Sequence, residues 1–371
     1  MSNGAGNRQN EPFARVVKRA ELSTGRIVFL RLAAVALSLI AGGIFIACVG
    51  QNPFVIYGTI ISGAVRSVMA FQGTVKVMIP LLVTSLGVTL AFKMKFWNIG
   101  GEGQIIFGAT CATFFALFCS GLNHVLLIII MFLAGFIGGG LWGLLPAIFK
   151  VKYNTNETLF TLMLNYIALH IVSYLRDGPW MDPGSQGFPK IARFDKNASL
   201  DKLFGIQFGW LIALILVIII FVYIKYTKQG YEISVVGESQ DTARYAGMNV
   251  KKIVLRTMFL SGGICGMAGM LQATGSDITL TTSVAGGVGF TAIIIAWLAQ
   301  LNPFSILLVS FLFSVLEKGS SVVQSNYGLS TDCADVLQGI ILFFILGCEF
   351  FIRYRFLFRK KTKEVEKEGT K

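Results

Sequence analysis

Residues Val125–Phe149, VLLIIIMFLAGFIGGGLWGLLPAIF, are 25 consecutive positions without a charged side chain. A helix needs about 20 apolar residues to cross a hydrocarbon core of about 30 Å, so this stretch is long enough for one crossing. Ile128, Ile129 and Ile130 make it apolar on every side, whereas a surface helix of a soluble protein keeps a polar face. The stretch therefore predicts a transmembrane helix.

The composition of the whole chain agrees with a membrane protein. Of 371 residues, 54% are hydrophobic and 14% are charged, whereas about a quarter are charged in ordinary soluble domains. The longest uncharged run, Ile278–Leu316, is too long for one membrane span. We divide it at Asn302-Pro303, because proline disfavours helix at the residue before it. We therefore predict an all-α integral membrane protein with ten spans. They are residues 28–49, 76–92, 103–121, 125–148, 157–175, 207–225, 253–273, 284–300, 303–317 and 335–352.

The positive charges predict which side of the membrane each segment faces. Ten spans put both ends on one side, and with the N-terminus in the cytoplasm 24 of the 32 Lys and Arg residues fall in cytoplasmic segments. Lys and Arg are enriched in such segments, so cytoplasmic N- and C-termini are expected. We divide the chain into a cytoplasmic tail (1–27), a transmembrane domain (28–352) and a basic cytoplasmic tail (353–371). Within the domain, 176–206 is predicted to be an external loop and 226–252 a cytoplasmic loop.

The sequence lacks the residue patterns of an enzyme, a metal site or a nucleotide site. Its two histidines, His124 and His170, are not spaced for zinc binding with any cysteine pair. No Gly-Lys dipeptide occurs, which excludes a Walker A loop. The spans hold almost no ionisable side chains, which ion-coupled carriers use. We expect no catalytic residue, metal or cofactor, and no nucleic-acid partner. A transported solute would then move passively, or a second protein would supply the energy.

A glycine-rich polar segment, Asn98-Ile-Gly-Gly-Glu-Gly-Gln104, lies between the second and third predicted spans. Three glycines in four positions let the backbone approach other groups closely. Such backbone is tolerated at membrane depth where it lines a cavity or is buried in protein. Glu102 with the amides of Asn98 and Gln104 could bind a polyhydroxylated solute, or these groups could hold the loop itself. Glu102 could also simply occupy the first turn of a helix, where a carboxylate is favourable.

A second glycine cluster, Gly286–Phe290, begins the eighth predicted span. In the predicted topology it faces the opposite side of the membrane from the first cluster. Spans two to five and seven to ten are five helices apart and would run inverted, which is typical of inverted-repeat transporters. Glycines at four-residue spacing within 135–143 and 262–266 predict close helix packing.

The cytoplasmic loop 226–252 contains the pattern of a short helix. Ser239 is suited to cap a helix over residues 240–246, and Gly247 is suited to its left-handed end. A short helix with small and polar faces cannot be buried in lipid. It is typical of a docking surface for a soluble partner, although an ordinary structured loop would show the same pattern.

Together these segments resemble the permeases of ABC importers of the ribose, branched-chain and nucleoside type. Asn98–Gln104 is similar to their Asn-Ile-Gly-Gly-Glu-Gly-Gln motif, and Asn156–Ala168 to their fifth-helix motif. Gly237–Asn249 is similar to the coupling loop that docks in a cleft of the ATPase. In the external loop, the proline-containing turns within 178–189 favour the branch of basic-membrane-protein-type nucleoside and simple-sugar importers.

The resemblance implies a multi-pass permease of type II ABC importer architecture, with inverted repeats, in the bacterial cytoplasmic (inner) membrane. Its solute would be a nucleoside. The implied partners are a cytoplasmic ATPase that binds the ATP, a second permease that is often a paralogue, an extracytoplasmic solute-binding lipoprotein, and membrane lipid. The residues placed near the substrate pathway are Asn98, Gly100, Glu102, Gln104, Asn165 and Phe290. The residues placed at the ATPase contact are Gly237, Glu238, Ala243, Arg244, Gly247 and Asn249.

Two other functions stay open at this point. Trp297, Gln300 and Asp277 depart from the family pattern around the eighth span, so the same permease role for a simple sugar such as a pentose is an alternative. A carrier driven by an ion gradient would need a titrating carboxylate within the membrane. Glu102 and Glu349 are the candidates for it.

Overall fold

The computed structural model describes residues 14–18, 23–185, 187–328 and 332–358, and most of them are helical. The chain forms two compact units. The first contains residues 1–53 and 335–371, and the second contains residues 54–334.

The first unit brings together segments from the two ends of the sequence. Helix α1 (Thr24–Cys48) follows strand β1 (Ala14–Lys18), and helix α13 (Asp332–Arg353) precedes strand β4 (Tyr354–Phe358). The two strands pair antiparallel, with Ala14 opposite Phe358 and Lys18 opposite Tyr354. The segments predicted to be tails thus contain a strand pair, and α1 begins four residues before the predicted first span. The cytoplasmic location of both tails stays a prediction.

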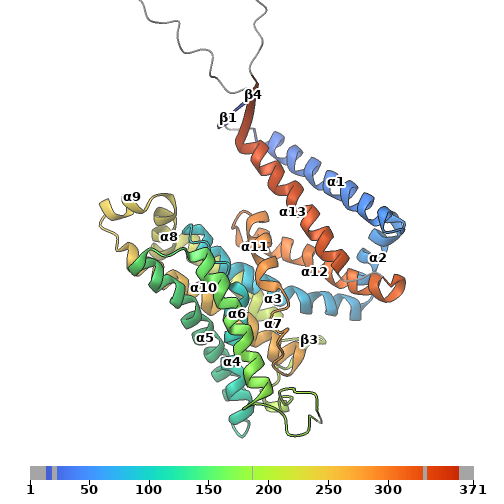
Figure 1. Ribbon diagram of the computed structural model, residues 1–371, viewed down its shortest axis with the longest axis vertical. Coiled ribbons are helices and arrows are strands. Elements are labelled where there is room, and N and C mark those ends of the chain that lie inside the picture. The colour runs from blue at the N-terminus through green and yellow to red at the C-terminus, as the bar shows by residue number, and fades with distance from the viewer. Residues whose placement is uncertain (1–13, 19–22, 186, 329–331, 359–371) are drawn as a thin grey trace, which may run out of the picture. The chain divides into compact units, whose positions relative to one another are not determined.

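The second unit holds the other helices (Figure 1). They are α2 (Pro53–Val65), α3 (Val68–Lys93), α4 (Gly101–Phe118), α5 (His124–Tyr153), α6 (Glu157–Asp177), α7 (Gly209–Tyr226), α8 (Lys228–Glu238), α9 (Gln240–Tyr245), α10 (Val250–Gln272), α11 (Val288–Leu298) and α12 (Pro303–Tyr327). A π-helical turn, Ala273–Asp277, extends α10. The connection from α6 to α7 carries a 3-10 turn, Lys196–Ala198, and a small hairpin of β2 (Lys202–Leu203) and β3 (Ile206–Gln207).

Among the described residues, seven helices are long and apolar enough to cross a membrane: α3, α4, α5, α6, α7, α10 with its π-helical turn, and α12. Helices α1 and α2 together pass the same test, which would make eight crossings. The chain is therefore a multi-pass membrane protein. The predicted tenth span lies in α13.

One predicted span is not a full crossing. Residues 284–300 contain only the 11-residue helix α11, which is about 16 Å long at a rise of 1.5 Å per residue. That is about half of a hydrocarbon core. Two other helices extend beyond their predicted bounds. Helix α3 begins at Val68, before the predicted 76, and α12 continues to Tyr327, past the predicted 317.

Helices α3 and α10 form the centre of the second unit, since 89% and 78% of the most apolar stretch of each is buried. Helices α4 and α5 pack against α10 through glycines. A Cβ on Gly108 or Gly139 would overlap the backbone of α10 at Gly266. Because these backbones approach so closely, the predicted packing role of the spaced glycines is confirmed.

Candidate functional site

Glu102, in the first turn of α4, binds the beginning of α11. Its Oε1 accepts a hydrogen bond from the backbone N–H of Gly287 at 2.8 Å, and its Oε2 accepts one from Gly289 N–H at 2.8 Å. The first N–H groups of a helix have no partner within the helix, and a carboxylate there also interacts favourably with the helix dipole. Glu102 is therefore the N-terminal cap of α11, supplied from another helix.

Glycines are required where these two segments meet. Gly287 has φ +84°, in the left-handed region that favours glycine. A Cβ on Gly289 would overlap the backbone N and Cα of Glu102. The two glycine clusters therefore lie against each other, and the prediction that they face opposite sides of the membrane is wrong. The physical reason is that residues 278–287 are an irregular connection, long enough to span about 33 Å, so α11 need not begin where α10 ends.

The amides of Asn98 and Gln104 pair with each other inside the protein. Asn98 Nδ2 donates to Gln104 Oε1 at 3.2 Å, and Gln104 Nε2 donates to Asn98 Oδ1 at 3.3 Å. Asn98 Oδ1 also accepts from Gly100 N–H at 3.0 Å. Both side chains are fully buried. They therefore hold the connection between α3 and α4.

Helix α6 joins the same network through Asn165. Its Oδ1 accepts from Gly103 N–H at 2.8 Å, and its Nδ2 donates to the Ile99 carbonyl at 3.0 Å. Thr161, one turn earlier, accepts from Ile99 N–H at 3.2 Å. The Asn98–Gln104 motif and the α6 motif, about 60 residues apart in sequence, thus form one structure. We call this network, with Glu102 and the start of α11, the glycine junction.

Five of the six residues predicted near the pathway belong to the glycine junction. The sixth, Phe290, follows Gly289 and is 43% exposed. Sequence reasoning did not select Thr161, Gly287 or Gly289 as individual site residues. The signals for them were present, since Thr161 lies one turn before Asn165 and the two glycines lie in the second cluster.

The loop after α7 folds as two short helices, α8 and α9. Ser239 Oγ accepts from Thr242 N–H at 3.2 Å at the start of α9, and Gly247 has φ +74° just after its end. The predicted capped helix at 240–246 is therefore confirmed, with its last residue at Tyr245. The preceding helix α8 was not predicted from the sequence.

The residues predicted at the ATPase contact divide into a buried and an exposed set. Ala243 is 0% exposed and packs in a small core with Phe96 and Ile253. Gly237 is also buried, and a Cβ on it would overlap the carbonyl of Lys93 at the end of α3. These two residues position α8 and α9 and cannot touch another protein themselves. The exposed members of the set are Glu238, Arg244, Gly247 and Asn249.

Tyr245 was missed by the sequence reasoning. It is 94% exposed at the end of α9. The available signal was a single aromatic side chain in a short helix of small and polar residues. We call the exposed surface formed by Asp241, Arg244 and Tyr245 the α9 face.

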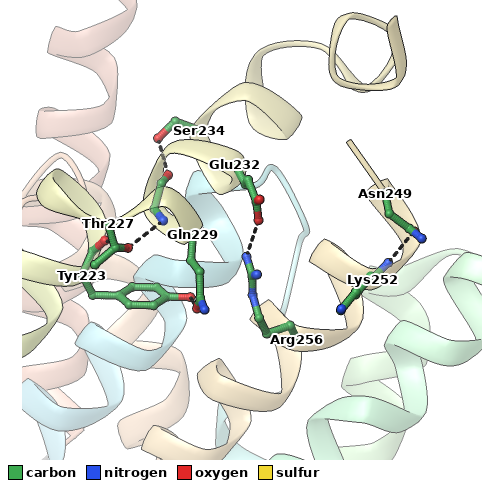
Figure 2. Close-up of polar contacts among 9 residues, drawn as sticks. Tyr223, Thr227, Gln229, Glu232, Ser234, Asn249, Lys252 and Arg256 are labelled. Carbon is green, nitrogen blue, oxygen red and sulfur yellow. Dashed lines mark hydrogen bonds and ion pairs between the residues drawn. The ribbon is translucent and has the colours of Figure 1, made fainter. Parts of the chain in front are cut away.

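Helix α8 is fastened to its neighbours by polar contacts (Figure 2). Arg256 Nη2 of α10 lies 3.0 Å from Glu232 Oε2 of α8, and these side chains are 26% and 16% exposed. Tyr223 Oη of α7 donates to Gln229 Oε1 at 3.0 Å. Asn249 caps α10 by accepting a backbone N–H of its first turn at 3.1 Å. Helix α8, which directly precedes α9 and which we call the base of α9, is therefore tied to α7 and α10.

Comparison with known proteins identifies the family of this chain. Residues 69–346 match the family described as branched-chain amino acid transport system / permease component. A glucose ABC transporter permease protein of Haloferax volcanii is 32% identical over 349 residues, which are 91% of this chain and 90% of that protein. A guanosine ABC transporter permease protein of Bacillus subtilis is 28% identical over 85% of this chain and 91% of its own length. A nucleoside ABC transporter permease protein of Lactococcus lactis is 29% identical over 86% of this chain and 91% of its own length. The chain is thus a member of the branched-chain amino acid transport system / permease component family.

Proposed function

We propose that this chain is the membrane-spanning permease subunit of an ABC importer that carries nucleosides across the bacterial cytoplasmic membrane. The observation that carries the proposal is the α9 face, an exposed surface on a short capped helix that is fixed to the membrane-spanning helices. Two of the three relatives described above are named for guanosine or nucleoside transport. Their names support the choice of substrate.

The proposed complex contains two permeases, a cytoplasmic ATPase, and an extracytoplasmic binding lipoprotein that delivers the solute. ATP is bound by the ATPase, so this chain needs no cofactor. The second permease is a copy of this chain or a paralogue. The tails and the loop 226–252 lie in the cytoplasm, and the loop 176–206 lies outside.

In this proposal, movement of the ATPase is passed on through the base of α9. Glu232 and Arg256 connect α8 to α10, and Gly237 rests on the end of α3. Because α3 and α10 are the two most buried of the described spans, a displacement of α8 acts directly on the centre of the second unit. The glycine junction then fixes the start of the half-length helix α11, which carries the exposed Phe290 beside the pathway. Discontinuous helices of this kind occur at transport sites.

A simple sugar is the second candidate substrate. The Haloferax volcanii relative, which matches at 32% identity, is named for glucose. The permease role and its partners are the same in both cases, so only the solute distinguishes them.

The geometry does not support Glu102 as the titrating carboxylate of a carrier driven by an ion gradient. Both carboxylate oxygens of Glu102 accept backbone N–H groups of α11, so this side chain already has a structural role. Glu349 lies in α13, and its side chain is outside the described part of the chain.

The docking proposal is tested by co-purification of the chain with its ATPase. Tyr245→Ala is expected to weaken the complex and to lower ATP-dependent uptake, because interface aromatic side chains often contribute about 2 kcal/mol or more. The matched control is Tyr231→Ala, which removes another exposed tyrosine, on α8.

Ala243→Glu is unsuitable as a test, because a charge at this buried site would disrupt the packing of the loop.

Thermal unfolding of the isolated chain should be unchanged in Tyr245→Ala, since the side chain is almost completely exposed. A Tyr245→Ala protein that binds the ATPase and supports uptake as the parent does would disprove the assignment of the α9 face.

A further inference from the structure

A cavity of about 600 Å³ lies beside the α9 face. At about 30 Å³ for each water molecule, it has room for roughly 20 waters. Its walls come from the turn after α3, the end of α5, the start of α6, α9 and the start of α10. The cavity therefore lies at the same end of the membrane-spanning helices as α9.

The lining of this cavity is strongly basic. Lys95, Lys150, Arg244 and Lys251 contribute four cations, and Glu157 contributes one carboxylate. Glu157 Oε2 lies 2.9 Å from Lys150 Nζ, and the Glu157 side chain is 15% exposed. This carboxylate therefore neutralises Lys150. A partly enclosed site with an excess of one charge concentrates the electrostatic field and attracts groups of opposite charge. We call this site the basic cavity.

Two of its lysines, Lys95 and Lys251, have no counter-charge within the part of the chain that the structure describes. Among the described residues, neither Lys95 nor Lys251 has an ion-pair partner or a side-chain hydrogen bond, and both are exposed. Arg244 does pair with Asp241 at 3.1 Å, but both side chains are more than 60% exposed, and such pairs contribute little. The positive charge of the basic cavity is therefore available to a ligand.

The backbone at Lys95 supports a role for its side chain. Its φ is +57°, in the left-handed region that glycine adopts without strain. Its N–H donates to the Phe92 carbonyl at 2.9 Å and closes the end of α3. A glycine would make the same backbone turn at lower conformational cost, so the turn alone does not account for a lysine here.

We propose that the basic cavity receives an acidic segment of the ATPase that docks on the α9 face. This inference rests on the function proposed above. Gln240 and Arg244 of α9 line the cavity, and Arg244 also belongs to the α9 face, so a protein that covers this face also contacts the wall of the cavity. Carboxylates on that protein would pair with Lys95 and Lys251 and fix the orientation in which it docks. An anionic lipid headgroup is the competing occupant.

The test compares two double variants with equal changes of charge. Lys95→Glu with Lys251→Glu reverses the charge of the two exposed lysines of the cavity. Lys228→Glu with Lys252→Glu is the matched control, because these lysines are exposed, lie in the loop 226–252 as Lys251 does, and do not line the cavity. Binding of the purified ATPase is measured in neutral detergent over a range of salt concentrations. Size-exclusion chromatography with fluorescence detection checks that all variants are monodisperse and therefore folded.

Association of the ATPase with the cavity variant is expected to be at least about tenfold slower at low salt, with a weaker dependence on salt. The control variant is expected to stay within about threefold of the parent, since its charges act only at longer range. Equal rates for the cavity variant and the parent would overturn the inference, and so would an equal loss in the control.

Three further outcomes separate this inference from its alternatives. A loss that occurs only in nanodiscs with phosphatidylglycerol, and not in zwitterionic ones, would show that the cavity binds a lipid headgroup and would overturn it. If Tyr245→Ala weakens binding while the cavity variant does not, docking on the α9 face stands and only the role of the cavity fails. If the parent chain does not bind the ATPase at all, both proposals fail.

Discussion

Replacement of Glu102 by Gln distinguishes a side chain that holds α11 from one that binds solute. In the structure each carboxylate oxygen accepts one backbone N–H, from Gly287 and from Gly289, at 2.8 Å. Glutamine offers one oxygen and one NH₂ group in nearly the same volume. One of the two N–H groups would therefore lose its acceptor and face another donor.

The expected cost follows from the bond that is lost. A hydrogen bond to a charged group contributes about 1.5–3 kcal/mol, and a buried donor left without a partner costs about 1–3 kcal/mol. These two figures describe the same loss and are not added. We expect Glu102→Gln to lower the free energy of unfolding by about 2–3 kcal/mol, which is a large part of the 5–15 kcal/mol typical of proteins.

The assay is unfolding of the purified chain by titration with sodium dodecyl sulfate in mixed micelles, together with ATP-dependent uptake. Glu238→Gln is the control for the unfolding titration alone, because Glu238 is an exposed carboxylate without an ion-pair partner among the described residues. The free energy of unfolding of this control should stay within about 0.5 kcal/mol of the parent value. Glu102→Asp keeps the charge but is one methylene shorter, so an intermediate loss is expected. If Glu102→Gln unfolds like the parent and yet loses uptake, Glu102 acts on the solute and the capping role is refuted.

Three further substitutions test the glycine junction and the base of α9. Gly289→Ala places a Cβ against the backbone at the start of α4 and is expected to cost about 1–3 kcal/mol in the same titration; an unchanged midpoint would show that the two backbones are not in contact. Glu232→Ala leaves the partly buried Arg256 unpaired and should cost about 1.5–3 kcal/mol, with partial recovery in the exchanged pair Glu232→Arg, Arg256→Glu. Recovery would be absent if the pair did not form. Gly237→Ala should push α8 away from the end of α3 and reduce ATPase binding at the co-purification step, and normal binding would argue against that contact.

Local features of this fold could be predicted from the sequence. Spans such as α5 follow from the length of an uncharged run, because the cost of polar groups in lipid acts on each residue separately. Helix α9 could also be predicted from local sequence. Ser239 caps its start with a hydrogen bond, and Gly247 adopts the left-handed backbone angle that follows its end.

The junction and the half-length helix could not be predicted in this way. Glu102 and Gly287 are 185 positions apart in sequence, and no local pattern specifies that one meets the other. Residues 278–287 carry no charged side chain, so hydrophobic length alone extends the predicted span 284–300 over the last four of them. Small residues were ambiguous for another reason. Gly237 and Ala243 suit both a docking surface and a tightly packed base, and only their burial distinguishes the two.

The most direct test of the proposed transport is uptake by the reconstituted complex. The chain is placed in proteoliposomes with its ATPase, the second permease and the binding lipoprotein, and accumulation of a labelled nucleoside is measured with ATP on the ATPase side. We predict accumulation that requires ATP, stops when the ATPase is left out, and is competed by unlabelled nucleosides but not by glucose or a pentose. Uptake by the chain alone under an ion gradient, or ATP-dependent uptake of a sugar that nucleosides do not compete, would contradict it.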